Sequence, residues 1–89
     1  MSQILDNLNF LATNATAIVA RNATQALQYQ QALDQGQITQ SEYIDLMQDL
    51  ANMLNIADAA DDLNNKILLE RCISIAISVG GAIYSNLPA

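Results

Sequence analysis

Few side chains in this sequence are of types that could do chemistry. There is one cysteine, Cys72, no histidine and no tryptophan, and the only basic residues are Arg21, Lys66 and Arg71. A catalytic nucleophile needs a neighbouring base, and a zinc site needs Cys or His ligands. The sequence therefore predicts no catalytic residue, no cofactor site and no metal site. Without a histidine partner, Cys72 is expected to be a buried, inert thiol, and the protein is not expected to be an enzyme.

Three aspartates form the densest group of titratable side chains. Asp58, Asp61 and Asp62 lie at i, i+3 and i+4 on a predicted helix, so they share one face. Such a ridge could bind a cation or supply an acid and a base, but no calcium-loop pattern accompanies it. The favoured interpretations are a solvated surface or a docking site for a basic partner. The second would make the chain an acidic adaptor.

The charge balance argues against nucleic acid as a direct partner. Nine carboxylates and three bases give a formal net charge of −6, the wrong sign for gripping a phosphate backbone. Lys66 and Arg71 are expected to pair with the carboxylates of Asp6, Asp62 or Glu70. Neutral amides supply much of the polar surface, with nine Asn and nine Gln among 89 residues. Because such a surface repels little, copies of the chain could pack against one another.

The elements that must position these residues are two helices. Residues 3–35 contain no Gly or Pro, and apolar residues recur every seven positions in three adjacent rows, which predicts one long helix. The rows include Ile4, Leu8, Leu11 and Ile18. An apolar stripe of that width is typical of a helix that packs against at least two neighbours. Asn22 interrupts one row, where it would either fix the register of an oligomer or mark the edge of the stripe.

A turn separates the two predicted helices. Gly36 can take the left-handed conformation that ends a helix, and Thr39 with Glu42 has the spacing of a capping box. Ile38 and Tyr43 stand at the positions of a hydrophobic staple. The run from Gly36 to Tyr43 resembles the connector of many short helical hairpins, including small helical modules of bacterial proteins. This resemblance implies an αα-hairpin.

The second helix is predicted over residues 39–84, and its last part is the most apolar stretch of the sequence. If the two helices pair antiparallel about the turn, the start of the first helix lies opposite the region near Arg71. Residues from Cys72 onward should therefore extend beyond the hairpin. Three structures are open for residues 72–84: a continued helix in an oligomeric core, a β-hairpin turning at Gly80–Gly81, or a membrane-inserting segment. The continued helix is favoured over the membrane segment because a span needs about 20 apolar residues.

Together these patterns predict an all-α fold with a single domain over residues 1–89. It is a two-helix antiparallel hairpin with an apolar C-terminal extension. Its expected parts are helix 3–35, turn 36–38, helix 39–84 and C-terminal tail 85–89. One hairpin leaves part of each stripe exposed, so a homo-oligomeric helical bundle, trimeric or higher, is expected. The expected interface residues are Ile4, Leu8, Leu11, Ile18, Asn22, Ile73, Ile75, Ile77, Val79 and Ile83.

The stretches Asn14–Ile18 and Asn22–Thr24 resemble coiled-coil segments of tailed-phage fibre and whisker proteins. The low base content, amide-rich surface and small size are similar to accessory virion and assembly proteins of such phages. The resemblance implies a non-enzymatic structural component of a virion, with other structural proteins of that assembly as partners. If the chain is not phage-encoded, a cytoplasmic location is expected, since its start lacks the pattern of a signal peptide. A small membrane-active protein that inserts residues 72–84 is the alternative.

Overall fold

The computed structural model describes residues 3–57 and 60–80, and these ranges contain helices and no strand. The helices are α1 (Gln3–Asn14), α2 (Ala17–Asp34), α3 (Gln40–Ile56), the short 3₁₀ helix η1 (Ala60–Asp62) and α4 (Leu63–Ser78). The predicted all-α class is thus confirmed over the described residues. The β-hairpin alternative is wrong for residues 72–78, because these belong to α4.

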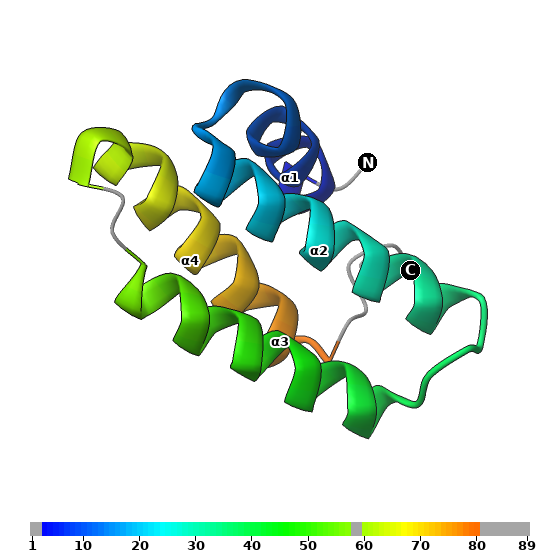
Figure 1. Ribbon diagram of the computed structural model, residues 1–89. Helices are drawn as coiled ribbons and strands as arrows, with labels where there is room; N and C mark the ends of the chain where they lie inside the picture. The colour runs from blue at the N-terminus through cyan, green and yellow to red at the C-terminus, as the bar shows by residue number, and fades with distance from the viewer. Residues whose placement is uncertain (1–2, 58–59, 81–89) are drawn as a thin grey trace.

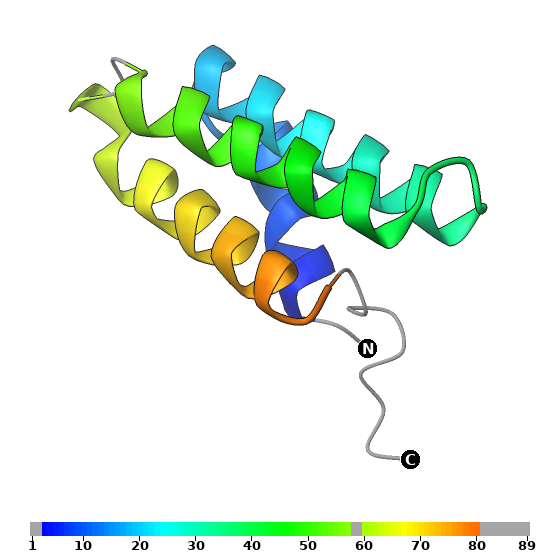
Figure 2. The same ribbon diagram turned by 90° about the horizontal axis from the view of Figure 1, so that it is seen from below.

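The helices form a small bundle in which α2, α3 and α4 run side by side in alternating directions (Figures 1 and 2). Helix α1 crosses these three helices, and it packs against both α2 and α4. The three helices also contact one another: α3 packs against both α2 and α4, and α2 contacts α4. Because α1 folds back over α4, one face of the C-terminal half of α4 is covered by the chain itself.

The first predicted helix is broken in two. Helix α1 ends at Asn14 and α2 begins at Ala17, so the prediction of one helix over residues 3–35 is wrong. The side chain of Asn14 donates to the Phe10 carbonyl at 3.0 Å, and Thr16 has the extended backbone of an N-cap, with φ −61° and ψ 162°. Short polar side chains of this kind compete with helix hydrogen bonds, which favours a break where they cluster.

The second predicted helix is also broken. Helix α3 ends at Ile56, Ala57 is extended with ψ 141°, and α4 begins at Leu63, so the continuous helix over residues 39–84 is wrong. The Lys66 ammonium donates to the carbonyls of Asn55 and Ala57, both at 3.3 Å. A cation at the C-terminal end of α3 satisfies free carbonyls and opposes the helix dipole, and this stabilises the stop. Residues 79–84 of the predicted helix lie partly, and the tail 85–89 wholly, outside the described residues.

The core collects one row of side chains from each of the four α-helices. Its buried members are Leu8, Leu11, Val19, Ala23, Ala26, Tyr43, Met47, Leu50, Leu54, Leu69, Cys72, Ile73 and Ala76. Three of these residues, Cys72, Ile73 and Ala76, lie in the segment that was predicted to extend beyond the hairpin. That prediction is wrong, because it paired two straight helices, whereas the break before Thr16 lets α1 turn and cover α4.

The turn between α2 and α3 follows the sequence prediction. Gly36 has φ +73°, and the capping box is complete: the Glu42 backbone N–H donates to Thr39 Oγ1 at 3.1 Å, and the Thr39 backbone N–H donates to the Glu42 carboxylate at 2.8 Å. At the staple positions, Tyr43 is fully buried and Ile38 packs partly buried against the core. The turn therefore fixes where α3 starts and which of its faces meets α2.

Candidate functional site

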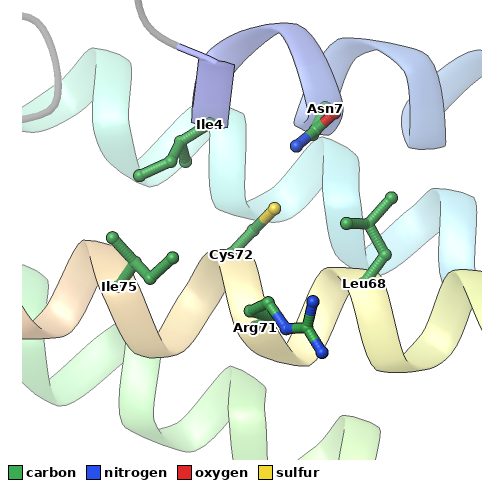
Figure 3. A pocket seen from close by; sticks show the side chains of 6 residues that line it. All are labelled: Ile4, Asn7, Leu68, Arg71, Cys72 and Ile75. Carbon is green, nitrogen blue, oxygen red and sulfur yellow. The ribbon is translucent and has the colours of Figure 1, made fainter.

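A pocket opens on the surface between α1 and α4 (Figure 3). It has a volume of about 230 Å³ and is partly open to solvent. The side chains that line it are Ile4 and Asn7 from α1 and Leu68, Arg71, Cys72 and Ile75 from α4. Spacings of three and four residues put the α4 side chains on adjacent turns of one face, and Ile4 and Asn7 are also three apart. The bend after Asn14 is what brings these two helices together.

Cys72 lies at the floor of this pocket and is only 3% exposed. Burial raises the pKa of its thiol above the ordinary value of 9.0, although a hydrogen bond with Asn7 and the charge of Arg71 both act to lower it. At neutral pH the group is therefore the protonated thiol, which is a poor nucleophile. The expectation that Cys72 is buried is thus confirmed.

Arg71 supplies the positive charge of the pocket (Figure 3). The sequence predicted that it would pair with a carboxylate, yet it forms no ion pair or hydrogen bond with any residue in 3–57 or 60–80. The same prediction for Lys66 is wrong, because Lys66 donates to backbone carbonyls at the end of α3. An exposed guanidinium that has no described carboxylate partner can bind an acidic group of another molecule. The aliphatic side chains beside it offer that molecule an apolar contact.

The structure divides the predicted interface residues into three groups. Leu8, Leu11 and Ile73 are fully buried inside the single chain, so they stabilise its own core and present no surface. Ile4, Asn22 and Ile77 are half-buried, and Ile18, Ile75 and Val79 are exposed. Ile83 lies outside the described residues. Of the predicted set, Ile4 and Ile75 are brought together at the pocket.

Asn22 does not face the core directly. It is half-buried, and its side-chain amide donates to the carbonyl of Ile18 one turn earlier at 2.9 Å. A hydrogen bond within its own helix satisfies this amide without a partner from another element. The arrangement matches the interpretation of Asn22 as the edge of the apolar stripe.

The acidic ridge does not form as predicted. Asp61 and Asp62 lie in η1 and not on a continuous α-helix, and Asp58 lies outside the described residues. The Asp62 carboxylate is engaged inside the molecule: it accepts from the backbone N–H of Thr16 at 2.8 Å, from the Thr16 hydroxyl at 2.9 Å and from the Asn65 amide at 2.8 Å. These hydrogen bonds, with the Thr16 N–H first, lower the pKa of Asp62. No group of three potential metal ligands occurs in the part of the chain that the structure describes.

A buried polar contact between α2 and α3 was missed in the sequence. The Tyr43 hydroxyl donates to Gln30 Oε1 at 2.8 Å, and both side chains are fully buried. Gln30 in turn donates to the Asp34 carboxylate at 3.2 Å, and burial raises the pKa of Asp34. Gln30 stands on the buried row of α2 with Val19, Ala23 and Ala26, and this position in an otherwise apolar row was the signal that could have revealed it.

None of the helices in residues 3–57 and 60–80 combines the length and the hydrophobicity that a membrane span requires. Comparison of the chain with protein-family models, with curated proteins and with solved structures finds no match.

Proposed function

We propose that this chain is a non-enzymatic structural protein that associates with copies of itself as a subunit or assembly factor of a larger complex. One observation carries the proposal: Ile75 on the last turn of α4 and Val79 at its C-cap are 40% and 42% exposed, and Ile75 lines the open pocket between α1 and α4. Aliphatic side chains beside a surface pocket are typical of protein interfaces.

The proposal that the chain is not an enzyme rests on its side chains. The sequence has no histidine, and its single thiol is buried with a raised pKa. A pocket of this kind can hold a side chain of another subunit without reacting with it. The resemblance of residues 14–24 to phage fibre segments leads us to propose a tailed-phage particle as the larger complex, with a trimer or higher oligomer as its unit and with other structural proteins of the particle as further partners.

The native mass of the full-length chain in solution without detergent tests self-association. We expect a defined oligomer by sedimentation velocity, and the Ile75→Asp variant should reduce the mass to that of a monomer because it places a charge in the apolar contact. Ile67→Asp is the matched control, since Ile67 is on the same helix and is 43% exposed but does not line the pocket. A monomer at all concentrations of the unchanged chain would refute the proposal.

A further inference from the structure

The outer face of α3 carries an exposed isoleucine at the end of an acidic row. Asp45, Asp49, Asn52 and Ile56 are spaced by four, three and four residues, so they lie along one face of the helix. All four are exposed, and they lie opposite the buried row that contains Leu50. Ile56 is 84% exposed, the highest value among the exposed large apolar side chains that the structure describes. A projecting aliphatic group on a surface of this kind can insert into a pocket of another molecule.

The pocket between α1 and α4 has the size and lining to receive such a group. An apolar cavity of about 150 Å³ can hold benzene, a six-carbon molecule, whereas an isoleucine side chain has four carbons. The pocket is larger, at about 230 Å³, and Ile4, Leu68 and Ile75 give it aliphatic walls. At its side stands Arg71, which makes no ion pair with the described carboxylates.

We propose that Ile56 of one copy inserts into the α1–α4 pocket of a second copy, with the acidic row of α3 facing Arg71 of that copy. The inference rests on the proposed self-association and specifies its contact. Charge complementarity favours a second copy as the occupant, because the chain carries both the acidic row, in which Asp49 lies two helical turns before Ile56, and a pocket whose Arg71 pairs with no described carboxylate. The cation beside Ile56, Lys66, is already engaged with the carbonyls of Asn55 and Ala57.

This contact is heterologous. The inserting surface on α3 and the receiving surface on α1 and α4 share no residue, so each copy can insert into one neighbour while it receives another. Contacts of this type close into a ring if the rotation between copies allows it and otherwise extend into a filament. Either form would suit a component of a larger assembly.

A mixing experiment tests the inference. Ile56→Asp removes the inserting side chain and Ile75→Asp blocks the pocket; both residues are exposed, so each variant should keep its fold, as circular dichroism can verify. Each variant alone is expected to be monomeric by sedimentation velocity. An equimolar mixture is expected to form a heterodimer, because one intact side chain and one intact pocket remain, while Ile67→Asp should assemble as the unchanged chain does.

The outcomes separate the two proposals. If the unchanged chain is monomeric, self-association itself fails. If the unchanged chain assembles but Ile56→Asp assembles equally well, or the mixture contains monomers only, the contact proposed here is wrong while self-association stands. An interface that uses the same surface on both copies would not be restored by mixing.

A charge exchange tests the role of the acidic row. Arg71→Glu and Asp49→Arg should each weaken assembly about threefold to tenfold, because each places like charges opposite one another. The double variant restores the attraction and should assemble within about twofold of the unchanged chain. If the double variant assembles as weakly as the single variants, Asp49 does not face Arg71 of the neighbouring copy.

Discussion

The Asp62 carboxylate holds the N-terminus of α2, because it accepts hydrogen bonds from both the backbone N–H and the hydroxyl of Thr16, 46 residues earlier in the chain. Thr16 makes no side-chain cap of its own. A carboxylate there satisfies a free N–H group and interacts favourably with the helix dipole. The contact ties the α1–α2 corner to the start of α4, and this corner is what places α1 over α4.

Removal of the Asp62 charge should lower the thermal midpoint at neutral pH. Asp62→Asn keeps the shape of the side chain but weakens the hydrogen bonds to Thr16, since charge-assisted bonds are the stronger ones. The measurement is thermal unfolding followed by circular dichroism at neutral pH. Asp61→Asn is the control, because this neighbour is exposed and makes no hydrogen bond among the described residues. An equal effect of both substitutions would contradict the role of Asp62.

The pH dependence of stability should differ in sign between Asp62 and Asp34. The pKa of Asp62 is lowered from 3.8, so its contribution is present above that value and is lost as the pH falls through the lower folded value. Burial raises the pKa of Asp34, so the preference of the folded state for its protonated form is present below 3.8 and is lost as the pH rises. In urea unfolding between about pH 2 and pH 6, Asp62→Asn should therefore show a smaller acid loss than the unchanged chain, and Asp34→Asn a larger one. Parallel curves would contradict both assignments.

The hydrogen bond between Tyr43 and Gln30 should contribute measurably to the free energy of unfolding. Tyr43→Phe removes the hydroxyl that donates to a fully buried amide oxygen, and the expected loss in free energy of unfolding is about 1–3 kcal/mol. Tyr29→Phe is the matched control on α2, where the hydroxyl makes no hydrogen bond with a described residue, and it should change stability by less than about 0.5 kcal/mol. Urea unfolding measures both. Both variants keep the aromatic ring, so equal effects would contradict the contribution of the Tyr43–Gln30 hydrogen bond.

Gly80 should tolerate a side chain less well than Gly36. Both have positive φ, at +62° and +73°, so alanine at either costs about 1–2 kcal/mol of backbone strain. A Cβ at Gly36 meets open space, but at Gly80 it would displace the side-chain amide of Gln40, which donates to the Gly80 carbonyl at 2.7 Å. Gly80→Ala should therefore cost about 0.5–1.5 kcal/mol more than Gly36→Ala in urea unfolding. With Gln40→Ala as background, that difference should vanish, and its persistence would contradict the explanation.

Features formed by residues close together in the sequence could be predicted, and features formed by residues far apart in the sequence could not. The capping box of Thr39 and Glu42 was predictable because both partners lie within four residues of each other. The break at Thr16 was not, since the carboxylate that holds the new helix end is supplied by Asp62 from the other half of the chain. Without this break, the sequence predicts two straight paired helices with Cys72 beyond the hairpin, whereas Cys72 lies in the core. The pocket depends on the same bend, so the sequence could not predict that Ile4 and Ile75 are neighbours.

Alkylation of Cys72 should report how often α1 separates from α4. The thiol is 3% exposed and its raised pKa keeps it protonated, so iodoacetamide should react with the folded chain at least about a hundredfold more slowly than with the urea-unfolded chain. The rate in the unfolded chain should rise with pH around the ordinary thiol value, whereas the folded chain should react only through opening of the α1–α4 contact. Ile4→Ala loosens that contact and should speed the folded-state reaction, while Phe10→Ala, an exposed residue of the same helix, should leave it unchanged. Equal rates in folded and unfolded chains would contradict the placement of Cys72 beneath α1.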